Sequence, residues 1–395
     1  MDYPIVFIPG LFGSLGDDVI KGTGEFSFGL AERIYRPFIK ILNAMGYMEG
    51  LNLFISYYDW KKPVLEAVDK YLFPDIEKVK SKTRKNKVII IGHSLGGLLG
   101  RAYISYFSPS SVDKFIMIGT PNLGAVNAYY FWSGGKIPYS KVEDNIIYNG
   151  LKIGFMLYFS LFKNISHIEV LRSIFPVARD LLPSFGYGNY LFYEENGKRK
   201  EIAVERMLAK NIFLSELEEK YIDPSKIFII AGKDIFTNKE FLVDVKNKGK
   251  TKWKDGKPIK AYRTNYGDGT VTTFSALGNL NGQNILLEGN HTDILYKSKD
   301  YLSSVLEKPL SKDIRGEAVE KVHIIFAKNC DRINVITPLI NEISSQRINI
   351  VDNRVEAIYL GNDNFWIMVA GDRDLEIQLD KSVIGEIFVK SIRKD

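Results

Sequence analysis

The stretch KVIIIGHSLGG, residues 87–97, joins an apolar, β-branched run to the segment LLGRAYISYF. A run of this kind is typical of a buried strand in a parallel sheet, and the glycines that follow it indicate a tight turn. We therefore predict a strand over 87–91, a helix over 95–107 and Ser94 at the corner between them. The alternative is an ordinary strand-to-helix turn in which the serine only caps the helix.

Glycines surround this corner on both sides. A sharp corner forces the backbone of Ser94 into a strained region and brings strand and helix close together, so Gly92 and Gly96 must be small. Gly97 extends the close contact by one residue. A serine presented in this way is a candidate nucleophile.

Short apolar runs alternate with helix-length segments over the first three quarters of the chain. This alternation is typical of a parallel sheet with helices on both faces, and it predicts a doubly wound α/β domain over 1–310. The predicted strands cover 4–8, 51–55, 87–91, 114–118, 226–230 and 284–288, and the predicted helices cover 30–45, 63–82, 95–107, 270–278 and 292–307.

Three other regions depart from this pattern. Residues 121–222 are too long for an ordinary crossover and are rich in aromatics, so we predict an inserted lid or cap. Residues 233–266 carry turn signals and predict a β-hairpin that leaves the sheet edge. Residues 316–395 hold short strands without a helical period, which predicts a separate all-β module, a small sandwich.

Composition excludes several classes of protein. The 395 residues are 45% apolar, and 53 Lys and Arg against 47 Asp and Glu give a net charge of +6, which gives no indication of nucleic-acid binding. Cys330 is the single cysteine, so no internal disulfide can form.

No signal peptide is visible, so we expect a cytoplasmic protein, although secretion stays open. The longest apolar segment, 153–162, is too short to cross a bilayer, so no transmembrane segment is expected.

A serine nucleophile needs a base, and the chain has only four histidines. His93 flanks the serine and must point elsewhere, His167 lies in the aromatic insert, and His323 alternates within a predicted strand of the β module. His291 remains. It follows the last predicted core strand and precedes the final helix, which is the position of a base in this type of fold.

The carboxylate that orients the base has two candidates. Asp234 directly follows the strand 226–230, whereas Asp268 lies in YGDGTVT, where glycines on both sides allow a sharp turn and Thr270 can cap the next helix.

Backbone amides would stabilise a negatively charged oxygen in the site. Leu95, the residue after the candidate nucleophile, supplies one amide. The loop FIPGLFGS, residues 7–14, supplies the other through Leu11, because the Pro-Gly step lets the backbone turn its N–H group toward the site. Phe12 is the second choice. This chemistry needs no metal and no organic cofactor.

Six motifs together resemble the lecithin:cholesterol acyltransferase family, with its lysosomal phospholipase and bacterial lipase-like members. The resemblance runs from residue 4 to about 306 and rests on IPGLFGS, GHSLGG at 92–97, IGTPNLGA at 118–125, RDLLPSFGY at 179–187, GDGTV at 267–271 and NHTDIL at 290–295. GHSLGG and TPNLG are shared with many lipases, whereas the pairing of LLPSF with GDGTV is more specific.

The resemblance implies an α/β-hydrolase fold, a mobile cap, and hydrolysis or transacylation of lipid esters through a serine acyl-enzyme. It implies that Asp268 is the acid and Leu11 an oxyanion donor. The chain departs from the animal members because it lacks cysteine pairs and carries the β module, so lecithin and cholesterol are not carried over as substrates.

Three hypotheses follow from the sequence. The first is a serine esterase of lipase type with Ser94, Asp268 and His291, which would make transient contact with a lipid interface. The second is a soluble carboxylesterase or thioesterase for short acyl groups. The third is a non-catalytic binding protein on a hydrolase scaffold. The aromatic insert is either a lid or a rigid subdomain whose aromatic side chains form its own core.

Overall fold

The computed structural model describes residues 2–16, 25–138, 145–163, 168–246, 252–311, 319–382 and 384–394. The chain forms two compact units, each built from three segments. Unit 1 comprises Met1–Leu11, Phe38–Pro138 and Ile165–Asp313, and unit 2 comprises Phe12–Pro37, Tyr139–Asn164 and Ile314–Asp395. The helix α1 (Glu32–Ala44) contains the point at which the chain passes from unit 2 to unit 1.

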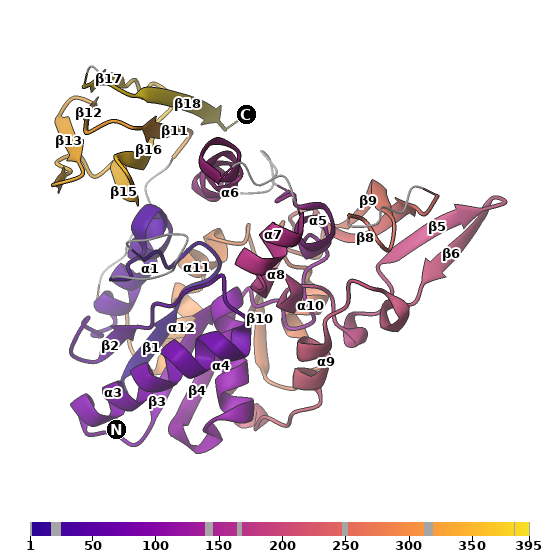
Figure 1. Ribbon diagram of the computed structural model, residues 1–395. Coiled ribbons are helices and arrows are strands. Elements are labelled where there is room, and N and C mark those ends of the chain that lie inside the picture. The colour runs from indigo at the N-terminus through magenta and orange to yellow at the C-terminus, as the bar shows by residue number, and fades with distance from the viewer. Residues whose placement is uncertain are drawn as a thin grey trace. The chain divides into compact units, whose positions relative to one another are not determined.

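Unit 1 is built on a six-stranded sheet in which every neighbouring pair is parallel (Figure 1). The strand order is β10-β7-β4-β3-β1-β2, so the chain passes from β1 to one edge at β2 and then, from β3 onward, to the other edge at β10. The strands are β1 (Ile5–Ile8), β2 (Leu53–Ile55), β3 (Val88–His93), β4 (Val112–Ile118), β7 (Ile227–Lys233) and β10 (Gln283–Glu288). The predicted doubly wound α/β fold is therefore confirmed.

The helices of unit 1 cover this sheet. The helix α4 (Leu95–Tyr106) packs on β3 and is buried over most of its length, which agrees with its apolar sequence. The predicted helix over 63–82 is divided, because the wider turn Val68–Leu72 separates α2 (Val64–Ala67) from α3 (Phe73–Thr83). The remaining core helices are α10 (Thr273–Leu277), α11 (Asp293–Lys297) and α12 (Lys299–Leu306).

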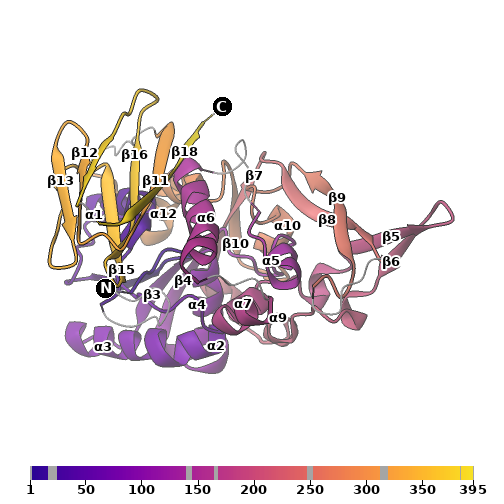
Figure 2. The ribbon, with the colours of Figure 1, turned by 45° about the horizontal axis from the view of Figure 1, so that its top comes forward.

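The hairpin predicted within 233–266 is present, but it belongs to a second sheet. The strands β8 (Thr237–Asp244) and β9 (Lys257–Thr264) pair antiparallel, and β8 also pairs with β5 (Leu191–Glu195). With β6 (Lys198–Ile202) they form a four-stranded sheet of order β6-β5-β8-β9 (Figure 2). The hairpin thus pairs with strands of the insert and not with the central sheet.

Most of the aromatic insert also belongs to unit 1. Its helices there are α5 (Ala128–Gly134), α7 (Ile168–Ile174), α8 (Val177–Asp180) and α9 (Ile212–Glu218). Tyr129 and Tyr190 are buried in one apolar cluster with Phe241 of β8, and the rings of Tyr129 and Tyr190 meet edge to face at 6.0 Å. These aromatic side chains therefore form a core of their own.

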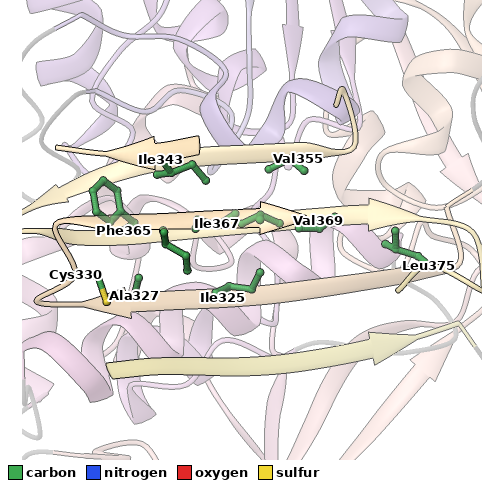
Figure 3. Close-up of a cluster of buried hydrophobic side chains, with 11 residues drawn as sticks. Ile325, Ala327, Cys330, Ile343, Val355, Phe365, Ile367, Val369 and Leu375 are labelled. Carbon is green, nitrogen blue, oxygen red and sulfur yellow. The ribbon is translucent and has the colours of Figure 1, made fainter. Parts of the chain in front are cut away.

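Unit 2 contains a sandwich of two antiparallel four-stranded sheets. One has the order β15-β16-β11-β18 and the other β14-β13-β12-β17. Their strands are β11 (Lys321–Lys328), β12 (Arg332–Ile336), β13 (Ile340–Ser344), β14 (Ile348–Asn349), β15 (Val355–Gly361), β16 (Asn364–Gly371), β17 (Gln378–Lys381) and β18 (Glu386–Arg393). Side chains from both sheets form one buried cluster that includes Ile325, Ile343 and Ile367 (Figure 3).

The helix α6 (Ile146–Tyr158) belongs to unit 2 although it comes from the aromatic insert. Alternate residues of β16 face opposite sides, so Phe365 and Ile367 enter the sandwich core while Trp366 packs on α6. A Cβ atom on Gly154 would lie 2.1 Å from Trp366 Cζ2, so only glycine allows this contact. The insert predicted as one lid over 121–222 is therefore divided between the two units.

No helix in the described part of the chain is long and apolar enough to cross a membrane.

Candidate active site

Ser94 occupies the corner that the sequence predicted. The strand β3 ends at His93 and the helix α4 begins at Leu95, with Ser94 between them at φ 53° and ψ −122°. A positive φ is strained for a residue with a side chain, so the surrounding structure must hold this conformation. The amide of Ser94 donates to the carbonyl of Ile118 at the end of β4, over 2.8 Å.

The glycines beside Ser94 are required by steric contacts. A Cβ atom on Gly96 would lie 2.2 Å from the carbonyl oxygen of Ile8, and one on Gly92 would lie 2.6 Å from the backbone of Gly97. A Cβ atom on Gly97 would overlap the hydroxyl of Thr120. Strand and helix therefore approach at a distance that only glycine permits, as the sequence predicted.

His291 lies on the loop between β10 and α11 and is 1% exposed. Its Nε2 lies 2.8 Å from Ser94 Oγ, and its Nδ1 lies 2.8 Å from Asp268 Oδ2. A carboxylate oxygen can only accept, so Nδ1 donates to Asp268. In the neutral imidazole Nε2 then accepts the hydroxyl hydrogen of Ser94, which is the arrangement that a general base requires.

Asp268 is held by its own loop and is fully buried. Its Oδ1 accepts hydrogen bonds from the amides of Thr270 at 2.9 Å and Val271 at 2.7 Å. Its other oxygen, Oδ2, is thereby directed to His291. The amide of Gly269 donates to the hydroxyl of Thr237 at 2.8 Å, which ties the same loop to β8.

The alternative acid is placed differently. Asp234 follows β7 at φ 66°, its side chain is 48% exposed, and its Oδ2 forms an ion pair with Lys233 at 3.1 Å. Asp234 is thus a turn residue in contact with solvent, and of the two candidate acids it is Asp268 that the structure places beside His291.

Because His93 flanks the candidate nucleophile, the sequence predicted that it points away from the site. This prediction is wrong, since the ring of His93 contacts the loop of His291. His93 is buried, and its Nε2 lies 2.9 Å from the backbone oxygen of His291. Burial is the main cause that lowers the pKa of His93 to about 3, and the nearby His291 is a smaller one. Nothing in the sequence pattern indicated this contact, because it joins positions that are almost 200 residues apart.

The other two histidines lie elsewhere. His323 is in β11 of unit 2, where its Nδ1 lies 2.8 Å from Ser391 Oγ, and desolvation lowers its pKa. His167 lies outside the described residues.

The predicted oxyanion donors lie at the start of α4 and on the loop that follows β1. Leu95 begins α4, so its N–H group is one of those that a helix start leaves without an intrahelical acceptor. Leu11 follows Gly10, where a Cβ atom would lie 2.8 Å from Ser94 Cβ. The hydroxyl of Tyr58 donates to the carbonyl of Pro9 over 2.8 Å and holds this loop. Phe12, at φ 64°, has its ring in unit 2, 4.7 Å from that of Phe155.

The described residues contain no group of three or more His, Cys, Asp or Glu side chains that could hold a metal ion.

A parallel doubly wound sheet, with a strained serine at the end of a central strand and a histidine on the loop after the last strand, defines the α/β-hydrolase fold. Residues 24–148 match the model of the lecithin:cholesterol acyltransferase family, so the predicted resemblance is confirmed over this part of the chain. The matched part contains GHSLGG and IGTPNLGA. The motifs IPGLFGS, LLPSF, GDGTV and NHTDIL lie outside it.

Solved structures to which this chain is similar share little sequence with it. The product of gene lin2722 from Listeria innocua is 12% identical, with 80% of this chain and 97% of that chain covered and a TM-score of 0.38. The mature lipase BlEst2 of Bacillus licheniformis is 15% identical, with 77% and 91% covered and a TM-score of 0.35. For a carboxylesterase of Nitrososphaera gargenis the values are 14%, 77%, 89% and 0.33.

Proposed function

We propose that this protein is a serine hydrolase of lipase type, which cleaves the carboxylic esters of acyl lipids through an acyl-enzyme. The observation that carries the proposal is the continuous chain from Ser94 Oγ through both nitrogens of His291 to Asp268 Oδ2, with 2.8 Å at each contact. The hydrolase fold and the family match over 24–148 support an ester as the substrate.

In the first half of the reaction Ser94 Oγ attacks the carbonyl carbon of the ester while His291 Nε2 takes the hydroxyl proton. Asp268 keeps the imidazole in the required tautomer and stabilises its protonated form. The amides of Leu11 and Leu95 stabilise the oxyanion. The bond to the alcohol then breaks, His291 returns the proton to the leaving oxygen, and the acyl group stays on Ser94.

In the second half a water molecule attacks the acyl-enzyme. His291 takes one proton from this water as its oxygen bonds to the acyl carbon, and then gives the proton to Ser94 Oγ when the bond between Ser94 and the acyl carbon breaks. The products are a carboxylic acid and free enzyme. An alcohol in place of water would give transacylation by the same steps.

The acyl-lipid substrate is inferred from the family resemblance and from the apolar insert, whose helix α6 carries half-buried Met156 next to buried Phe155. Activity on esters of increasing chain length, measured below and above their solubility limit, tests this inference. Higher activity above the limit supports a lipase, and activity confined to short soluble esters or thioesters supports the soluble esterase instead.

Replacement of the nucleophile tests the reaction itself. We expect Ser94→Ala to lower kcat/KM on an ester panel by at least about 10⁴-fold, because it removes the hydroxyl that lies 2.8 Å from His291 Nε2. The exposed Ser173 provides the control, and Ser173→Ala retains wild-type activity. A fluorophosphonate should label the wild type and Ser173→Ala but not Ser94→Ala. A folded wild type that is neither labelled nor active on any ester would favour the binding protein.

A further inference from the structure

The hydrogen bond between His93 and the loop of His291 is not used in the reaction described above. His93 is the last residue of β3 and directly precedes Ser94. Its Nε2 lies 2.9 Å from the backbone oxygen of His291, and the two imidazole rings lie 4.9 Å apart at an angle of 44°. One side chain therefore connects the strand that presents the nucleophile to the loop that presents the base.

The chemistry of the two partners fixes the direction of this bond. A backbone carbonyl oxygen can only accept, so His93 Nε2 carries the hydrogen and donates it. The other ring nitrogen, Nδ1, faces the oxyanion loop, since a Cβ atom on Gly10 would lie 3.1 Å from it. Burial holds the pKa of His93 near 3, so the ring is neutral at ordinary pH and exists as the Nε2–H tautomer.

The bond complements the two contacts that orient the ring of His291. Asp268 and Ser94 hold the imidazole through its nitrogens, whereas His93 holds the backbone from which that imidazole extends. Proton transfer requires Nε2 to stay within hydrogen-bond distance of Ser94 Oγ, and displacement of a catalytic group by 1 Å can cost about 100-fold in rate.

A neutral donor suits this position for an electrostatic reason. His291 becomes positively charged when it takes the proton of Ser94, and a cation 4.9 Å away would oppose this charge. A lysine or arginine could donate to the same carbonyl, but it would raise the energy of the protonated base. A buried neutral imidazole donates without this penalty.

We propose that His93 is a positioning residue, which donates Nε2–H to the carbonyl of His291 and thereby keeps the base within reach of Ser94. The inference rests on the proposed function, because it assigns a role toward the same base.

Two substitutions of equal length separate the hydrogen bond from packing. Glutamine carries an N–H donor at about the position of the imidazole Nε2, whereas methionine has a similar length and no donor. We expect His93→Met to lower kcat by about 10- to 100-fold with KM changed less than about threefold. We expect His93→Gln to retain kcat within about fivefold of the wild type. His323→Met, at a buried histidine of unit 2, is the matched control and retains wild-type kcat.

The outcomes are decisive in either direction. Wild-type kcat in His93→Met overturns the proposal, and so does an equal loss in His93→Met and His93→Gln, which would assign the effect to packing. If Ser94→Ala remains active, the proposed function fails with it. If Ser94→Ala is inactive and His93→Met keeps the kcat of the wild type, the proposed function stands and only the role of His93 fails.

A spectroscopic measurement on the wild type covers the case in which His93→Met does not fold. In ¹⁵N-labelled protein the histidine signal that is missing from His93→Gln should show a neutral Nε2–H tautomer that does not titrate between pH 5 and 9. A midpoint near the ordinary histidine value, or the opposite tautomer, overturns the proposal.

Discussion

Unit 1 buries a chain of hydrogen-bonded polar side chains beside its parallel sheet, whereas unit 2 buries an apolar cluster between two antiparallel sheets. In unit 1 the hydroxyl of Ser94, both ring nitrogens of His291 and Oδ2 of Asp268 form one line of hydrogen-bond contacts, and single glycines decide how closely the elements approach. In unit 2 the largest buried side chain is Trp366, whose Nε1 has no partner among the described residues.

The difference shows how each unit depends on its residues. A buried polar network loses its function when one donor or acceptor changes, even if the volume is kept. An apolar core is insensitive to such changes but responds to lost volume. Activity should therefore depend on single atoms in unit 1, and stability should depend on side-chain size in unit 2.

The largest effect is expected from a change of one atom in unit 1. Asp268→Asn keeps the volume but leaves the His291 contact with a neutral amide, which no longer selects the productive tautomer or stabilises the protonated ring. We expect kcat to fall by about 10³- to 10⁴-fold with little change in KM, measured on the ester that the wild type hydrolyses fastest.

The other candidate acid gives the control for this prediction. Asp234→Asn changes only an exposed ion pair with Lys233, so kcat should stay within about twofold of the wild type. The reverse result, a large loss at Asp234 and none at Asp268, would remove Asp268 from the proposed triad.

In unit 2 the corresponding change is one of volume. Trp366 is fully buried and packs on Phe155 and Phe326, with ring centroids at 5.1 and 5.3 Å. Trp366→Ala should lower the free energy of unfolding of unit 2 by about 3–5 kcal/mol. Hydrogen exchange of peptides from α6, β11 and β16 measures this loss.

The matching exposed position on the same sheet is Phe388 in β18, and Phe388→Ala should change the stability of unit 2 by less than about 1 kcal/mol. If Trp366→Ala left exchange in α6 and β16 unchanged, the described packing of α6 on the sandwich would not determine stability.

The smallest expected effect concerns pH. Burial raises the pKa of Glu356, in β15 of unit 2, from 4.5 to about 8, and neighbouring Arg33 opposes this shift only in part. The folded state therefore keeps a proton that the unfolded state loses, so this contribution to stability is full below pH 4.5 and is lost as the pH rises through 8. Between pH 5 and 7 the loss amounts to about 2–3 kcal/mol.

His93 in unit 1 gives the opposite sign. Its pKa is lowered from 6.5 to about 3, so its contribution is full above pH 6.5 and is lost as the pH falls toward 3. Hydrogen exchange at pH 5 and 7 should therefore show unit 2 losing stability as the pH rises and unit 1 as it falls. Glu356→Gln should flatten the first slope. An unchanged slope in Glu356→Gln would exclude Glu356 as its cause.

The sequence predicted unit 1 well because its signals are local. All six core strands were expected within a few residues of their observed bounds, since each is a continuous apolar run followed by turn residues. Ser94 was chosen as the candidate nucleophile because it follows a predicted buried strand, and His291 was chosen as the candidate base because elimination left one histidine. Asp268 was chosen over Asp234 with the help of a family resemblance, because spacing alone allowed both.

Three features that the sequence did not predict are contacts between distant parts of the chain. The assignment of α6 to unit 2 depends on Gly154 accommodating Trp366, and an isolated glycine in a helix gives no indication of its partner. The pairing of β8 with β5 joins the hairpin to the insert, which strand patterns cannot specify. The contact of His93 with the His291 carbonyl uses a backbone atom, so no residue type reveals it.

The packing of α6 on the sandwich also has a consequence for the folding of the chain during its synthesis. Ribosomes release α6 long before β16, and β11 gains its second neighbouring strand only when β18 has emerged. During this interval the apolar face of α6 has no sandwich to cover it. Nascent chains should therefore be prone to aggregation, and we expect chaperones to bind them. Loss of β18 would leave β11 without this neighbouring strand and would prolong that exposure.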